Sequence, residues 1–269
     1  MNLNKPQILL TNDDGILSPG LWAAAAALEE IGYVHVVAPR EQSSGMGRSM
    51  PNSSDGIIEP KQVTVNQREW TVYAVGGSPA QAVQHGIFEI VPRKPDLVVA
   101  GINYGENLGL GITVSGTVGA ALEGAASGIP SLAVSLETAL EHHLSYSKDV
   151  DFTAAAYFTA YLGNLFMERK FPEDVKVLKI DLPAEANIQT PWEITYLSPV
   201  RMYDAVPPQR KSWDQPAKVG YRFSDQLNNA PAGSDIHAVR IKHRISVTPL
   251  SLDLTARADF SEIEAMLRA

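Results

Sequence analysis

Short apolar runs alternate with segments of helical pattern along the first two thirds of the chain, and this alternation constrains the fold most. The pairs Ser18-Pro19 and Ser78-Pro79 are typical of helix starts, because serine caps a helix and its first turn tolerates proline. Strands that alternate with helices form a mostly parallel sheet covered on both faces. We therefore expect an α/β fold with strands at residues 8–10, 33–38, 70–75, 96–101, 129–135 and 175–182, and helices that include 80–90, 119–127 and 152–166.

The pattern changes near Pro183. Beyond it, strand-like pieces are short and are separated by polar stretches that contain proline. We predict a core of residues 1–185 and a C-terminal β-rich extension of residues 186–269 that ends in a helix over 259–267. The strands expected in this extension are residues 193–197, 219–223, 238–241 and 245–247.

The extension contains five apolar positions that need cover: Val239, Ile241, Ile245, Val247 and Leu250. The core already has its own strands and helices, so a second subunit is the simplest cover, and two-fold symmetry is the commonest arrangement. We predict a homodimer or homotetramer whose contact lies in residues 186–269. The alternative is that this segment folds back on the core of its own chain.

Charge and composition narrow the class of protein. The formal net charge of −8 argues against binding to a nucleic-acid duplex, which requires a basic surface. The absence of cysteine excludes disulfides and thiolate metal sites and agrees with a reducing compartment. No apolar run approaches the ~20 residues of a membrane-spanning helix, and the first residues lack the apolar region of a secretory signal. We expect a cytoplasmic protein with no membrane partner.

Two adjacent carboxylates, Asp13 and Asp14, follow the first apolar strand and precede Gly15. In an open parallel sheet, the turn at the carboxyl end of a strand lies where ligands bind. Adjacent buried carboxylates repel each other and are best tolerated beside a cation. Asp-Asp-Gly is also a common turn sequence. These residues alone therefore leave both a metal or phosphate site and a simple turn open.

Polar side chains follow two further strands. Ser43 and Ser44 begin a polar segment, residues 40–61, that is long enough to be a functional loop or flap. Asn103 and Asn107 come after the strand at 96–101. Together with the two aspartates, these side chains offer only oxygen ligands, which favour Mg²⁺, Mn²⁺ or Ca²⁺. Two carboxylates leave such an ion with positive charge, which suits it to bind a phosphate.

The segment Ser115-Gly116-Thr117 stands at the predicted start of the helix that contains residues 119–127. Its free N–H groups, two hydroxyls and positive helix end form an anion cradle. The chain has no Walker A sequence there, and its first strand turn lacks the G-x-G-x-x-G of a dinucleotide site. The six histidines show no metal-ligand spacing, and we interpret them as surface or packing residues.

Five blocks of sequence occur in the order found in one protein family. They are Thr-Asn-Asp-Asp-Gly at 11–15, Val-Ala-Pro at 37–39, Gly-Ile-Asn-Tyr-Gly-Glu-Asn-Leu-Gly at 101–109, Ser-Gly-Thr-Val at 115–118 and Val-Thr-Pro-Leu-Ser-Leu-Asp-Leu-Thr at 247–255. Together they resemble the SurE family, the stationary-phase survival-protein nucleotidases, over nearly the whole chain. The resemblance implies a Rossmann-like three-layer sandwich with a C-terminal β extension that joins subunits. It also implies a metal-dependent phosphatase, a 5′- or 3′-nucleotidase that acts on nucleoside monophosphates.

The same resemblance implies the residues of the site. The family's metal ligands are two adjacent aspartates, a serine and an asparagine. They place one Mg²⁺ or Mn²⁺ per subunit at Asp13, Asp14, Ser44 and Asn103, with Ser43 as the alternative serine. The resemblance places the phosphate at Asn107, Ser115, Gly116 and Thr117. The residues expected to act in catalysis are Asp13, Asp14, Asn107 and Ser115.

The expected reaction is hydrolysis of a phosphate monoester, with two possible nucleophiles. One is water activated by the cation, with an aspartate as general base. The other is an aspartate that forms an aspartyl-phosphate, on a nucleotide, another small phosphate ester or polyphosphate. The rival from another class is a non-catalytic nucleotide- or phosphate-binding module. The paired carboxylates count against it, because without a metal they would repel the ligand.

Overall fold

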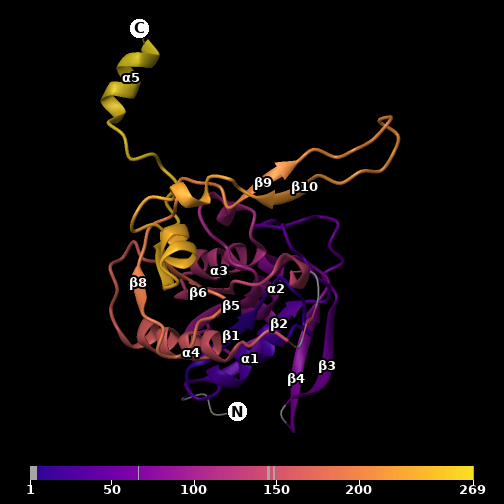
Figure 1. Cartoon of the computed structure of the whole chain (residues 1–269). Coiled ribbons are helices and arrows are strands. Elements are labelled where there is room, and N and C mark those ends of the chain that lie inside the picture. The colour runs from indigo at the N-terminus through magenta and orange to yellow at the C-terminus, as the bar shows by residue number, and fades with distance from the viewer. Residues whose placement is uncertain (1–4, 66, 144–145, 148, 269) are drawn as a thin grey trace.

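The computed structural model describes residues 5–65, 67–143, 146–147 and 149–268. A nine-stranded sheet of order β3-β4-β2-β1-β5-β6-β7-β11-β8 forms its centre (Figure 1). The strands of this sheet are β1 Gln7–Thr11, β2 Tyr33–Pro39, β3 Ile58–Val65, β4 Arg68–Val75, β5 Leu97–Tyr104, β6 Ser131–Leu136, β7 Val177–Leu182, β8 Trp192–Ile194 and β11 Ile245–Leu250. The α-helices are α1 Pro19–Leu28, α2 Pro79–His85, α3 Gly116–Ala126, α4 Thr153–Glu168 and α5 Phe260–Arg268. A separate two-stranded sheet pairs β9, Tyr203–Val206, with β10, Gly220–Phe223.

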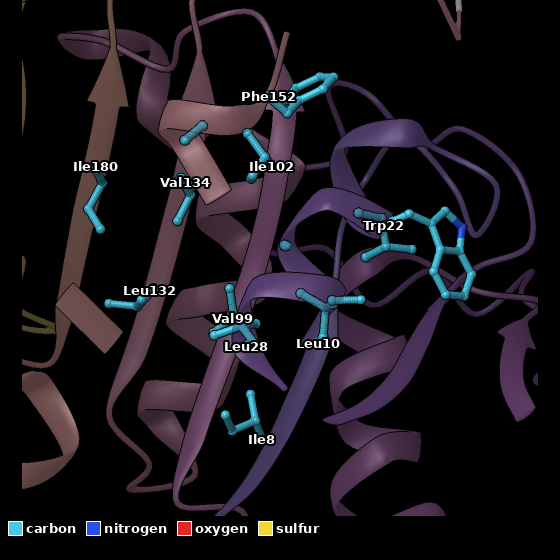
Figure 2. Close-up of a cluster of buried hydrophobic side chains, with 14 of the residues drawn as sticks. Ile8, Leu10, Trp22, Leu28, Val99, Ile102, Leu132, Val134, Phe152 and Ile180 are labelled. Atoms are coloured by element: carbon cyan, nitrogen blue, oxygen red, sulfur yellow. The ribbon is translucent and has the colours of Figure 1, made fainter. Parts of the chain in front are cut away.

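Helices cover both faces of the sheet, which gives the three layers of a Rossmann-like sandwich. Side chains alternate along a strand, so neighbouring residues of β1 enter different cores. Ile8 and Leu10 pack with residues of α1 and α4, whereas Leu9 packs with residues of α2 and α3. Figure 2 shows the first of these cores, where Trp22 and Phe152 flank the aliphatic side chains of the strands. The predicted fold class is confirmed.

The strands β4, β2, β1, β5, β6 and β7 are adjacent in this order and run parallel to one another. All six strands predicted for the core are present. The sequence did not predict β3, which pairs antiparallel with β4 at the sheet edge. Its residues alternate between half-buried and exposed, and they include Pro60 and two charged side chains. Pro60 has no N–H group to donate to a neighbouring strand, so it is tolerated on an edge strand. In the sequence, a segment with proline and charged side chains is typical of a loop.

The C-terminal third returns to the same sheet. β11 pairs antiparallel with β7, and β8 pairs parallel with β11. Ile245, Val247 and Leu250 are therefore buried by their own chain, and Val239 is buried in a separate cluster with Leu108 and Met202, while Ile241 is 40% exposed. The prediction that these five positions require a second subunit is wrong for Val239, Ile245, Val247 and Leu250.

Of two further predictions for the C-terminal third, the strand at residues 238–241 is wrong and the terminal helix is confirmed. Residues 238–241, predicted as a strand, lie in a π-helical turn over His237–Ile241. The terminal helix is present as α5, and it projects away from the body of the molecule, as does the β9–β10 hairpin (Figure 1). None of the helices in the described ranges has the length and apolar character needed to cross a membrane.

Candidate active site

Three neighbouring strands bring the predicted residues to one edge of the sheet. β1 lies between β2 and β5 and is parallel to both, so their carboxyl ends meet. Asp13 and Ser44 follow β1 and β2, and Asn103 lies near the end of β5. Together with Asn107 and Ser115 they line a cavity of about 330 Å³. A larger hollow, of about 810 Å³, lies between α1 and α4, away from the paired carboxylates.

The turn after β1 is built by residues other than the two aspartates. The amide of Asn12 donates to the Gly15 carbonyl at 3.0 Å, and its side-chain oxygen accepts from the Gly15 N–H at 3.2 Å. Gly15 has a φ of 101°, which favours glycine. Because Asn12 and Gly15 supply the turn chemistry, a simple turn does not explain the carboxylates of Asp13 and Asp14.

Both carboxylates are almost fully buried. Asp13 is 4% exposed and accepts a hydrogen bond of 2.5 Å from the Thr117 hydroxyl. Asp14 is 2% exposed and accepts from the Tyr104 N–H at 3.2 Å. Gly116 packs directly against Asp13, since a Cβ at this position would lie 2.7 Å from its carboxylate. The start of α3 therefore packs against Asp13 and holds its carboxylate in place.

Burial raises the pKa of both aspartates. For Asp14, the adjacent charge of Asp13 raises the pKa further, well above its ordinary value of 3.8. For Asp13, hydrogen bonds from Thr117 and Gly116 oppose the effect of burial. A cation beside the pair would relieve both the repulsion and the loss of solvation. The two carboxylates therefore fit a metal site.

The two candidate serines differ in their surroundings. Ser43 is buried, and its hydroxyl donates to the Glu41 carbonyl at 3.2 Å. Ser44 is exposed and lines the cavity together with Asp13 and Asn103. The side-chain NH₂ of Asn103 donates to the Gly105 carbonyl at 2.7 Å. The side-chain oxygen of Asn103 is therefore available as a ligand. This geometry favours Ser44 over Ser43.

The four residues predicted to hold phosphate do not share one role. Asn107 and Ser115 line the cavity. The Ser115 hydroxyl also caps α3 by accepting from the Val118 N–H at 3.1 Å. Gly116 and Thr117 contact Asp13 instead of lining the cavity. Their N–H groups and the Thr117 hydroxyl therefore act on Asp13, a role that the sequence did not reveal.

Comparison with known proteins decides the family. The family model described as Survival protein SurE matches residues 8–204. The chain belongs to the SurE family. A relative from Methanocella arvoryzae, named 5'-nucleotidase SurE, is 38% identical over 269 residues and is matched across 97% of this chain and 98% of its own. A second 5'-nucleotidase SurE, from Thermococcus gammatolerans, is 40% identical over 263 residues, with 97% and 96% covered.

A solved SurE structure agrees with the fold. It is titled as the crystal structure of Sure protein from Aquifex aeolicus, and it superimposes with a TM-score of 0.73 at 31% identity. The match covers 97% of this chain and 100% of that one. The β strands that complete the sheet after residue 185 therefore lie within the part that resembles a solved SurE protein.

The donor set of this SurE protein contains only two carboxylates. The residues that the structure describes contain no group of three or more histidine, cysteine, aspartate or glutamate side chains able to hold a metal. The paired carboxylates would thus need neutral oxygen ligands to complete a coordination shell. Ser44 and Asn103 stand at the same cavity and supply that chemistry.

Sequence reasoning missed several residues of the SurE cavity, which also includes Glu106, His143, Tyr203 and Tyr221. Glu106 lies between Gly105 and Asn107, and burial raises its pKa to about 7. Its position next to Asn107 was the one available signal. His143 was predicted to be a surface or packing residue. Its ring does pack edge-to-face with Tyr203, with 6.5 Å between the centroids, but it also lines the cavity. Only the folded hairpin brings the tyrosines here.

Proposed function

We propose that this SurE-family protein removes phosphate from nucleoside 5′-monophosphates and releases the nucleoside. The observation that carries the proposal is the meeting of Asp13, Ser44, Asn103, Asn107 and Ser115 around one cavity at the sheet edge. The relatives named 5'-nucleotidase SurE support the same reaction class, a phosphoric monoester hydrolase. Activity on 3′-monophosphates is a further part of the proposal.

We propose one divalent cation per subunit, Mg²⁺ or Mn²⁺, held by Asp13, Asp14, Ser44 and Asn103. Support comes from the oxygen-only donor set and from the raised pKa values of the two buried carboxyls. When bound, the cation would act as a Lewis acid toward the phosphoryl group. Thr117 and the first N–H groups of α3 hold Asp13 in place for this role.

The residues of the chain would orient the phosphate and move one proton. Asn107 and Ser115 line the cavity and offer polar atoms to phosphoryl oxygens, close to the α3 N-terminus at Gly116 and Thr117. In the favoured route, water attacks phosphorus as the bond from phosphorus to the ester oxygen breaks; an aspartate accepts a proton from the water and returns it to the ester oxygen, which leaves as the hydroxyl of the nucleoside. In the alternative route, an aspartate attacks and an aspartyl-phosphate is hydrolysed afterwards. Trapping with hydroxylamine during turnover distinguishes them, because only the second route yields an aspartyl hydroxamate.

The nucleoside would occupy the part of the cavity beside the phosphate site. Leu108, Met202, Tyr203 and Tyr221 line this part, and apolar and aromatic walls suit a nucleobase. The proposal is tested by incubating the protein with nucleoside 5′- and 3′-monophosphates, p-nitrophenyl phosphate and polyphosphate, with EDTA or with Mg²⁺ or Mn²⁺. Phosphate release that requires the metal supports it. Nucleotide binding without turnover would instead support the non-catalytic binding module.

We also propose that residues 186–269 join subunits into a homodimer or homotetramer, and that the protein acts in the cytoplasm. Support for the first is the projection of the β9–β10 hairpin and α5 from the body of the molecule (Figure 1). α5 has no buried residue, and its apolar side chains are exposed, including Phe260 at 60% and Leu267 at 82%. The absence of cysteine supports the second.

A further inference from the structure

A lysine is fully buried beneath the cavity. Lys179 lies on β7 with 0% exposure, on the opposite face of the strand from Leu178 and Ile180, which belong to the α1–α4 core. Asp181, two residues along the same face, is also 0% exposed, and so is Asp235 from the C-terminal third. Buried charges of this kind are costly unless they are paired and hydrogen-bonded.

The Lys179 ammonium has three acceptors, which matches its three N–H donors. Nζ lies 2.5 Å from Asp181 Oδ2, 3.2 Å from Asp235 Oδ2 and 2.9 Å from the backbone oxygen of Asn107. Burial alone would lower the pKa of Lys179, but the two carboxylates hold it above its ordinary value of 10.5. The ammonium is therefore charged and fully satisfied.

Asp235 Oδ1 accepts the N–H groups of Ser198 and Ile236, at 2.9 Å and 2.8 Å, and Asp181 Oδ1 and Asp235 Oδ2 accept from the loop that contains Asn107. Asp181 Oδ1 accepts the Asn107 N–H at 2.8 Å, and Asp235 Oδ2 accepts the Gly109 N–H at 2.9 Å. Both backbone groups of Asn107 are thus held from below, by Lys179 and Asp181. Its side-chain amide donates to Ser135 Oγ at 2.9 Å, which leaves the side-chain oxygen of Asn107 with a fixed direction.

A purely structural role does not account for this arrangement. Replacing a buried ion pair by apolar residues is often neutral or stabilising, so stability alone gives little reason for three buried charges. Three of their backbone contacts, two to Asn107 and one to Gly109, fall on the loop between β5 and α3 that borders the cavity. A charged anchor fixes a loop in one position more specifically than apolar packing does.

We propose that Lys179, with Asp181 and Asp235, is a positioning residue that holds Asn107 in register to bind the phosphate. This inference rests on the proposed function, because it takes Asn107 as a phosphate contact. Lys179 itself does not touch the substrate. Its loss would leave the cation ligands in place and would weaken binding of the phosphate.

Two matched double variants test the proposal. Lys179→Met with Asp181→Leu removes the pair and leaves the N–H and carbonyl of Asn107 without partners. Lys179→Gln with Asp181→Asn has the same net charge, and its amides can still donate to the carbonyl and accept from the N–H. We expect the Met/Leu variant to raise KM for p-nitrophenyl phosphate, and the inhibition constant of inorganic phosphate, by roughly ten- to a hundredfold. For the Gln/Asn variant, KM and the inhibition constant of phosphate should both stay within about threefold of the wild-type values, because Asn107 keeps its partners.

Leu178→Ala provides a control for lost stability. It truncates a buried side chain of the same strand on the opposite face, so Tm should fall while KM stays unchanged. The Mn²⁺ affinity of each variant, measured by calorimetry, should equal that of the wild type. Equal KM and phosphate inhibition in the two double variants would overturn the positioning role. A wild-type protein without phosphatase activity would instead overturn the proposed function, and direct calorimetry with inorganic phosphate would still compare the variants.

Discussion

At the scale of single residues, the paired carboxylates lower the free energy of unfolding of the metal-free protein. The pKa of Asp14 is raised in the folded state, so the folded protein binds its proton more tightly than the unfolded chain. The free energy of unfolding therefore falls as pH rises from the ordinary value of 3.8 through the raised folded pKa. Asp14→Asn should remove this decline, and denaturation in EDTA at several pH values measures it.

The same substitution should abolish turnover. Asp13→Asn and Asp14→Asn each remove a cation ligand and a charge from the site, so we expect kcat to fall by on the order of 10³-fold with Mg²⁺ or Mn²⁺ present. The fold should persist, because Asn keeps the shape of the side chain and relieves repulsion between the carboxylates. A variant with nearly wild-type kcat would show that its aspartate is only a turn residue.

Glu106 should give a second pH dependence. Burial raises its pKa from 4.5 to about 7, so the stability that it contributes is complete below pH 4.5 and is lost as pH rises through 7. The difference in pKa corresponds to about 3 kcal/mol. Glu106→Gln should therefore flatten the free energy of unfolding between pH 5 and pH 8, as measured by urea denaturation. A curve parallel to that of the wild type would contradict the buried, raised carboxyl.

At the scale of elements, the approach of α3 to the turn after β1 is set by one glycine. A methyl group at Gly116 would lie 2.7 Å from the Asp13 carboxylate, so Gly116→Ala must displace one of them. We expect kcat/KM to fall roughly 100-fold while the helix itself remains folded. Gly111→Ala is the matched control, because Gly111 borders the same cavity and a Cβ there meets nothing within 4 Å.

Local patterns predicted the elements that carry the site. The central strands are apolar runs, and parallel strands must bring their carboxyl ends together, so Asp13, Ser44 and Asn103 could be grouped from sequence. β3 could not be predicted, because an edge strand with polar, half-exposed residues resembles a loop. The roles of Lys179 and Tyr203 depend on contacts between segments far apart in the chain, which no local pattern contains.

At the scale of the whole molecule, burial within the chain changes the argument for a dimer. Ile245, Val247 and Leu250 lie on β11 in the molecule's own sheet, and Val239 is buried in a separate cluster with Leu108 and Met202. These four side chains leave nothing for a partner to cover. Exposed apolar side chains of the C-terminal third include those on α5, where Phe260, Ile263 and Leu267 recur at helical spacing. A short helix of this kind gains most of its stability from packing against another surface.

We therefore expect the full-length chain to scatter light at micromolar concentration with at least twice its 29.1 kDa monomer mass. Ile263→Asp with Leu267→Asp places charges on the apolar face of α5 and should shift the protein toward monomer. Glu262→Gln with Glu264→Gln alters the same helix without adding charge to that face, and this control should keep the larger mass. A full-length protein that scatters as a monomer would mean that the segment from residue 186 onward serves only its own chain. If the charged variant keeps the larger mass, the contact lies elsewhere, and the projecting β9–β10 hairpin becomes the surface to alter.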